Sequence, residues 1–201
     1  MRSRVRGDAG QAFPIYITVV GGLLFLAFAY LAVGQAAANR NGAQTAADAA
    51  ALAAAQERRD QLAAQWVTDV LDPTKWQDIF DGIAPLPDDP CGRADQLAAQ
   101  NDAEVLGCSP NGLLSYTVEV RTNKTVGESV IPGTEDKQST ASATADIELL
   151  CEFEPPAEDA PDDAPDDVLP RLDCEDRDWD LDPDDLVLPE PEDLFEVHLA
   201  D

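Results

Sequence analysis

The sequence predicts an α+β protein with a single N-terminal transmembrane helix that continues into a long Ala-rich helix. A small extracytoplasmic domain with an antiparallel β-hairpin follows, and then a disordered acidic C-terminal tail. Three observations predict this order: an uncharged apolar stretch, an Ala-rich stretch directly after it, and two later segments of period-two alternation. We divide the 201 residues into a basic cytoplasmic stub (1–8), a transmembrane helix (9–39), the domain (40–151) and the tail (152–201).

The transmembrane prediction depends on Ala9–Asn39, which contains no Asp, Glu, Lys or Arg. About 20 apolar residues in a helix match the roughly 30 Å thickness of the hydrocarbon layer. A helix also satisfies its own backbone polar groups, which lipid cannot do. The alternatives are a buried core helix and a cleavable signal peptide ending near the small residues of Gln35–Ala38.

The charges before this stretch predict its orientation. Arg2, Arg4 and Arg6 precede the apolar residues, and positive charge close to a span stays on the cytoplasmic side. We therefore expect a single-pass protein of the cell membrane that contacts lipid. Its N-terminus is expected in the cytoplasm and the bulk of the chain outside.

The Ala-rich stretch from Ala43 to Leu71 predicts a second helix, because alanine is the best helix former. We expect it to end before Pro73, and to meet the first helix with a bend near 39–42. Small residues recur at i, i+3 and i+4 and form a helix-packing face: Ala43, Ala46, Ala47, Ala50 and Ala54. This face could cover the core of its own domain, or it could also pack against copies or partners.

The four cysteines all lie beyond the span, in a compartment that tolerates disulfides. Four cysteines allow three pairings. We favour the pairs of chain neighbours, Cys91 with Cys108 and Cys151 with Cys174. Free thiols are the alternative, and neither spacing matches a C-x-x-C redox or zinc pattern.

The remaining elements of the domain follow from periodicity. A short helix is expected over Thr74–Phe80, with its apolar side chains inward. A helix over Arg93–Leu106 is expected to end at Gly107. Alternation predicts long strands over Leu113–Thr122 and Ser139–Leu150, with a short one over Thr125–Ile131. The two long strands should form a hairpin, with the Ala-rich helix and the helix at 93–106 on one of its faces.

The tail predicts disorder, because Asp, Glu and Pro dominate it and too little apolar surface remains to offset the cost of ordering. Residues 186–199 are apolar enough to dock locally. A formal net charge of −27 argues against nucleic-acid binding, which requires Lys and Arg. The alternating acids of Asp176–Asp184 lack the Gly and Glu of a calcium-binding EF-hand.

The sequence offers no recognisable catalytic constellation. Its single histidine, His198, cannot by itself build a triad or a zinc cluster. No nucleophile elbow, phosphate-binding loop or dinucleotide fingerprint occurs. We therefore expect no enzyme, no cofactor, no metal and no small-molecule substrate.

One segment carries a family resemblance. The residues RNGAQTAADAAALAAA, Arg40–Ala55, directly follow a single N-terminal span. This arrangement resembles the Tad (tight adherence, Flp-type) pilus-assembly proteins of the TadE/TadG kind, which have a basic stub, one hydrophobic helix and a run close to QNAADAAALAAA. Asp8–Gln11 before the span is similar to the actinobacterial TadG-like variant. The resemblance covers about residues 7–59.

The resemblance implies a pilus-assembly component whose partners are other pilus-assembly proteins or copies of itself, met through the N-terminal helices. Processed prepilins of such systems are cut after a Gly and carry Glu at the fifth mature position. Counted from Gly10, that position is Ile15, so we expect no such processing. The alternative hypothesis is an anchored extracellular binding module whose acidic tail recruits a basic partner or cations.

Overall fold

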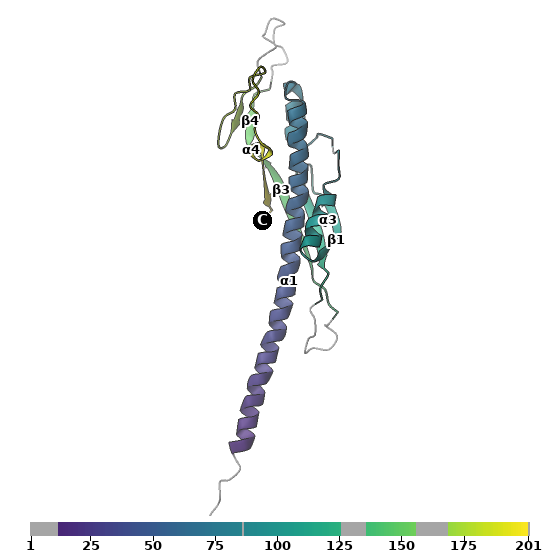
Figure 1. The fold of residues 1–201 in the computed structure, drawn as a ribbon, viewed down its shortest axis with the longest axis vertical. Helices are drawn as coiled ribbons and strands as arrows, with labels where there is room; N and C mark the ends of the chain where they lie inside the picture. Colours follow the sequence, from purple (N-terminus) through teal and green to yellow (C-terminus); the bar gives the residue numbers. More distant parts are fainter. Residues whose placement is uncertain (1–11, 86, 126–135, 156–168, 201) are drawn as a thin grey trace, which may run out of the picture.

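The computed structural model describes residues 12–85, 87–125, 136–155 and 169–200. One long helix, α1, runs the length of the molecule, and all the other elements gather around its C-terminal half (Figure 1). The elements in chain order are α1 (Ala12–Thr68), η1 (Pro73–Lys75), α2 (Trp76–Phe80), α3 (Cys91–Gln100), β1 (Ala103–Pro110), β2 (Ser115–Thr122), β3 (Thr140–Leu149), β4 (Cys151–Phe153), β5 (Leu172–Cys174), α4 (Pro191–Leu194) and β6 (Phe195–Leu199).

The predicted span and the Ala-rich helix form one continuous helix. α1 passes through Asn39–Gly42 without interruption, because a glycine inside a helix costs only about 1 kcal/mol and alanines follow at once. No sharp kink appears at that level in Figure 1. The helix ends at Thr68, three residues before the predicted Leu71, and the chain turns ahead of Pro73.

A four-stranded antiparallel sheet in the order β1-β2-β3-β6 packs against the C-terminal half of α1. The predicted hairpin is confirmed: β2 pairs with β3 from Ser115↔Asp146 to Arg121↔Thr140. The apolar side chains of β2 at Tyr116, Val118 and Val120 are buried, as their alternation predicts. α3 contacts both α1 and β1.

The prediction of a helix over Arg93–Leu106 is wrong in its second half. α3 ends at Gln100, and Asp102 adopts a left-handed φ of 55°, which a helix cannot continue through. From Ala103 the chain becomes β1, which pairs with β2. Gly107 is therefore no helix cap; it follows the register shift between Val105 and Gly107 in this strand. Pairing with β2 outweighs the weak helical period of the apolar residues.

The prediction of a largely disordered tail is not confirmed for residues 169–200. β5 pairs with β4, and β6 adds a fourth strand to the main sheet along β3. Phe195 is fully buried there. The docking predicted for 186–199 thus takes the form of strand pairing. The short strand predicted over Thr125–Ile131 falls almost wholly outside the described residues.

An aromatic cluster closes the end of the core that lies farthest from the N-terminus. Trp66 of α1 lies 5.4 Å from Trp76 and 6.5 Å from Phe80, measured between ring centroids. Phe153 contacts Trp76 and Phe80, and Phe195 contacts Phe80, in edge-to-face geometry. The cluster explains why Thr74–Phe80 turns its apolar side chains inward as predicted.

Candidate functional surface

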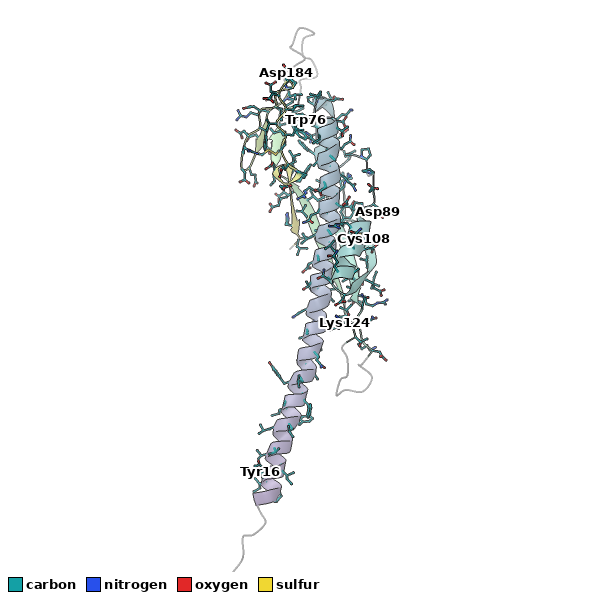
Figure 2. All side chains as sticks on the ribbon, in the orientation of Figure 1. Tyr16, Trp76, Asp89, Cys108, Lys124 and Asp184 are labelled. Carbon is teal, nitrogen blue, oxygen red and sulfur yellow. A yellow bond between two sulfur atoms is a disulfide. The ribbon has the colours of Figure 1, made fainter. Side chains whose placement is uncertain are left out.

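The N-terminal half of α1 exposes apolar side chains all round. Figure 2 shows this half projecting from the rest of the molecule, with Tyr16 near its end. Its hydropathy averages 2.2 over the most apolar window, and none of that window is buried in the protein. Of the described residues, this is the one helix long and apolar enough to cross a membrane. Such exposed side chains need an apolar environment: Ile15, Tyr16, Ile17, Val19, Leu23, Leu24, Phe25, Leu26, Phe28, Tyr30, Leu31 and Val33.

The folded head begins where the uncharged stretch ends. The side-chain amide of Asn39 donates to the carbonyl of Lys124 at 3.0 Å, and the Thr122 hydroxyl donates to the Asn39 side-chain oxygen at 3.3 Å. Lys124 also forms an ion pair with Asp102 at 2.5 Å. The charged side chains of Lys124 and Asp102 thus lie at the base of the head, beside Asn39, the last residue of the uncharged stretch (Figure 2).

The small-residue face of α1 is occupied by the protein's own head. The five alanines predicted for helix packing are all fully buried. They lie on the part of α1 that packs against β2, β3 and α3. Alanine leaves room for the sheet and a second helix to approach the α1 backbone on two sides. The structure therefore places these side chains in the domain core, and nearly all the exposed large apolar side chains of α1 lie between Ile15 and Val33.

A buried arginine fixes the segment after α2 to α1. Arg58 is only 2% exposed, and its guanidinium donates to the carbonyls of Gly82 at 2.7 Å and Ala84 at 2.9 Å. A longer contact reaches the carbonyl of Pro85 at 3.4 Å. Burial lowers the pKa of Arg58, since desolvation disfavours the cation. The three carbonyls compensate for the missing water, and no carboxylate among the described residues pairs with the guanidinium.

The conformation of Gly82 is part of this attachment. Its φ of +77° is left-handed, and a Cβ there would lie 2.8 Å from Leu114 Cδ2 and 3.0 Å from the Leu113 carbonyl oxygen. Nearby, the Tyr116 hydroxyl has its pKa raised by burial, partly offset by the positive charge of Arg58. The segment, α1 and β2 thus meet around one buried cation.

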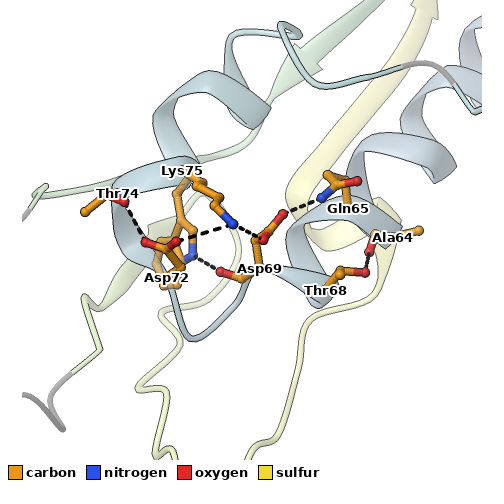
Figure 3. Close-up of polar contacts among 8 residues, drawn as sticks. Ala64, Gln65, Thr68, Asp69, Asp72, Thr74 and Lys75 are labelled. Atoms are coloured by element: carbon orange, nitrogen blue, oxygen red, sulfur yellow. Dashed lines mark hydrogen bonds and ion pairs between the residues drawn. The ribbon is translucent and has the colours of Figure 1, made fainter.

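A polar turn ends α1 at the far tip of the head (Figure 3). The Lys75 ammonium contacts the Asp69 carboxylate at 2.6 Å and the Asp72 carboxylate at 3.4 Å. Hydrogen bonds from Lys75 and Gln65 lower the pKa of Asp69. Thr74 and Lys75 lower the pKa of Asp72 in the same way. The last carbonyls of α1 are satisfied separately: the Asp69 N–H donates to the carbonyls of Gln65 and Trp66, and the Thr68 hydroxyl donates to that of Ala64.

Both disulfides join the chain neighbours that the sequence analysis favours. Cys91 bonds to Cys108, tying the start of α3 to β1, and Cys151 bonds to Cys174, tying β4 to β5. All four cysteines are thereby used. The region 169–200 is therefore attached to the head at two places: the disulfide holds β5 to β4, and strand pairing holds β6 to β3.

The described residues contain one group of potential metal ligands, Glu148, Glu196 and His198, whose donor atoms lie within 4.8 Å of one another. All three are at least partly exposed, on neighbouring strands β3 and β6. The Nδ1 of His198 lies 4.0 Å from Glu148, which is the geometry of a surface ion pair. We assign no metal to it.

Sequence reasoning missed three features of this surface. Arg58 carried no signal, because a single arginine in a helix looks like a solvated charge. β1 and β6 were missed because one was read as a helix and the other lies in acidic chain, although FEVHL alternates with period two. Arg2, Arg4 and Arg6, on which the predicted orientation depends, lie outside the described part of the chain. The assignment of the N-terminus to the cytoplasm therefore stays a prediction.

Comparison with known proteins adds one match. Residues 10–57 match the family model Tad, described as Putative Flp pilus-assembly TadE/G-like. No curated protein and no solved structure matches the chain. The match covers the exposed apolar half of α1, which is the candidate surface, and all five alanines of the buried helix-packing face. Residues 10–57 of this chain are therefore similar to the TadE/G-like Flp pilus-assembly proteins.

Proposed function

We propose that this protein is a single-pass, membrane-anchored component of a Flp-type pilus-assembly or secretion apparatus. Its N-terminus lies in the cytoplasm and its head lies outside. It acts without catalysis: the exposed half of α1 anchors the chain and packs against other spans, while the head presents a binding surface.

One observation carries this proposal: within a single helix, the family-matched segment passes from a fully exposed apolar half to a half buried in a disulfide-bonded head. A helix that is apolar all round is suited to lipid. The disulfides suit a head outside the cytoplasm. Since α1 is continuous, any displacement or rotation of the span in an assembly is transmitted directly to the head.

The topology can be tested with introduced thiols, because the native cysteines are all paired. We expect Asp95→Cys, on the exposed side of α3, to react with a membrane-impermeant maleimide in intact cells. Ser3→Cys should react only after permeabilisation. Recovery of the chain in the soluble fraction, or the reverse labelling pattern, would refute the proposed anchoring or orientation.

Packing of the span can be tested by a cysteine scan of residues 15–33 with oxidative crosslinking in membranes. If the span packs against copies or other pilus-assembly proteins, adducts should recur at every third or fourth residue, since one helix face is engaged. Asp95→Cys serves as the matched exposed control away from the span. Absence of adducts, or adducts equally strong at all positions, would contradict span packing.

The alternative is a binding module that recruits a basic partner or cations through its acidic tail. A short deletion distinguishes this alternative from the assembly proposal. Removing acidic, proline-rich residues 156–168 leaves the β4–β5 pair and β6 in the chain. The assembly proposal expects pilus formation to survive this deletion. Loss of partner binding with filaments intact would favour the binding module.

A further inference from the structure

Asparagine precedes glycine at two places in this chain, and the structure gives the two dipeptides different surroundings. Asn41–Gly42 lies inside α1, whereas Asn111–Gly112 lies in the bend between β1 and β2. All four residues are exposed. Exposure to solvent therefore does not distinguish the two places, and the backbone around each dipeptide does.

The reaction open to such a dipeptide is cyclisation of the asparagine side chain. The backbone nitrogen of the glycine attacks the side-chain carbon Cγ and forms a five-membered succinimide. The Cγ–Nδ2 bond breaks, and Nδ2 leaves as ammonia with the proton of the attacking amide. Water then adds to one of the two ring carbonyls and gives aspartate or its β-linked isomer, isoaspartate. One water is consumed, one ammonia is released, and nothing is oxidised or reduced.

Within α1 this attack is prevented at Asn41. In a helix interior the Gly42 N–H is donated to the carbonyl four residues earlier, so the attacking nitrogen is engaged. Ring closure also requires a torsion ψ at the asparagine that differs from the helical value of about −42°. Reaction at Asn41 therefore needs local opening of a helix that continues on both sides.

In the bend between β1 and β2 the attacking nitrogen is free. Pairing of the two strands ends at Pro110↔Tyr116, so residues 111–114 lie outside it. The Asn111 N–H closes the bend by donating to the Ser115 carbonyl at 2.8 Å. In the part of the chain that the structure describes, no backbone carbonyl accepts from the N–H of Gly112.

Gly112 also has open space around it. Its φ is +94°, which glycine adopts without strain, and a Cβ built there would meet no atom within 4 Å. The aspartate–glycine pair Asp81–Gly82, where the same cyclisation would expel water, shows the contrast. The Gly82 N–H donates to the Ile79 carbonyl at 3.0 Å. A Cβ at Gly82 would lie 2.8 Å from Leu114 Cδ2.

We propose that Asn111 is a site of spontaneous covalent modification, converted through a succinimide with Gly112 to aspartate and isoaspartate. Both products add a negative charge to the bend, and isoaspartate also lengthens the main chain there by one atom. Asn41 stays unmodified in the folded protein, because α1 holds the nitrogen that would attack it.

The fold accepts this change without losing the head. Cys108, just before the bend, is bonded to Cys91, so β1 stays tied to the start of α3 whatever happens at Asn111. On its other side β2 pairs with β3 from Ser115↔Asp146 to Arg121↔Thr140. A lengthened bend therefore loosens the near end of the β1–β2 pairing and leaves the β2–β3 pairing unchanged.

The test incubates the full chain in detergent micelles at slightly alkaline pH, with both disulfides intact, and follows each asparagine by peptide mapping and mass spectrometry. We expect Asn111 to be converted at least about tenfold faster than Asn41, because α1 must open before Asn41 reacts. Asn123, which is exposed and precedes Lys124, controls for the following residue. It should also react at least about tenfold more slowly than Asn111, since glycine alone leaves the attack unobstructed.

Unfolding separates the effect of the structure from that of the sequence. In denaturant, with the disulfides reduced, Asn41 and Asn111 both precede glycine in a flexible chain, so their rates should agree within about threefold. A tenfold difference that persists in the unfolded chain would overturn the proposal. So would equal rates in the folded chain, or no conversion of Asn111 while the unfolded chain reacts.

Variants test the consequence for the head. Asn111→Gln should abolish conversion at this position, because its ring would need one more atom. Asn111→Asp carries the added charge without the longer main chain. Amide exchange near the bend should be faster in the isoaspartate-containing fraction than in Asn111→Asp, with exchange along β3 equal in both. Loss of protection along β3 would refute the claim that the fold accepts the modification. The experiment needs neither a membrane nor a pilus, so its result is independent of the proposed function.

Discussion

Replacing Arg58 with methionine should destabilise the head more than any surface substitution, because it removes the only described donor group that joins α1 to the carbonyls of residues 82–85. Methionine fills a similar length but donates no hydrogen bond. Two bonds of a charged donor, at 2.7 and 2.9 Å, are lost, and each contributes about 1.5–3 kcal/mol. The gross loss is therefore about 3–6 kcal/mol.

Part of this loss is returned, since the variant no longer buries a cation. Desolvation is the main reason that the pKa of Arg58 is lowered, and apolar replacement of a buried charge relieves that cost. We expect a net decrease of about 2–4 kcal/mol in the free energy of unfolding. Amides of residues 82–85 should also exchange faster than those of β2, because their attachment is lost first.

The measurement is denaturant unfolding of the oxidised full chain in detergent, followed by tryptophan fluorescence of Trp66 and Trp76. Arg59→Met is the matched control: Arg59 forms an ion pair with Asp60 at 2.8 Å near the surface, so its loss should cost about 1 kcal/mol or less. Equal effects of the two substitutions, or no change in exchange at 82–85, would refute the argument that Arg58 holds this segment.

Three further predictions test other parts of the head. Ala50→Leu should cost about 1–3 kcal/mol in unfolding free energy, because the fully buried alanine face leaves no room for a larger side chain; unfolding curves of the variant check this. Replacing Cys91 and Cys108 together by serine should cost about 3 kcal/mol for a bridge over a separation of 17 residues, measured in the same way, while the other disulfide stays intact by mass. Hydrogen bonding, chiefly from Lys75, lowers the pKa of Asp69, so its stabilisation is present above the unfolded-state pKa of about 3.9 and is lost as the pH falls through the lower folded-state pKa. Unfolding measured from about pH 6 to pH 2 should therefore show an acid-dependent loss of stability that is smaller in Lys75→Met; equal profiles would contradict this assignment.

The sequence predicted those elements whose patterns are strong and local. The uncharged run before Arg40 and the alanines after it determine a long helix whatever surrounds them, because lipid-compatible composition and helix propensity act along the chain. The alternation of Tyr116, Val118 and Val120 likewise determined a half-buried strand. Cysteine pairing between chain neighbours followed from short separations.

The mistaken assignments arose where the pattern was weak and a distant partner decided the outcome. Residues 103–106 suit a helix as well as a strand, and pairing with β2 selects the strand. Phe195–Leu199 lies in chain too acidic to fold alone, and β3 offers it both hydrogen bonds and a place to bury Phe195. Local composition reports neither that β2 pairs with residues 103–106 nor that β3 pairs with Phe195–Leu199.

By itself, the amino-acid sequence determined an uncharged helix of membrane-spanning length, its alanine-rich continuation, the β2–β3 hairpin and the similarity of residues 10–57 to TadE/G-like proteins. Only the tertiary structure decided what the alanine face contacts, how Arg58 is buried, and where β6 ends along β3. Helix propensity and hydropathy are properties of successive residues, whereas burial of a charge and pairing of distant strands exist only once distant segments have packed together.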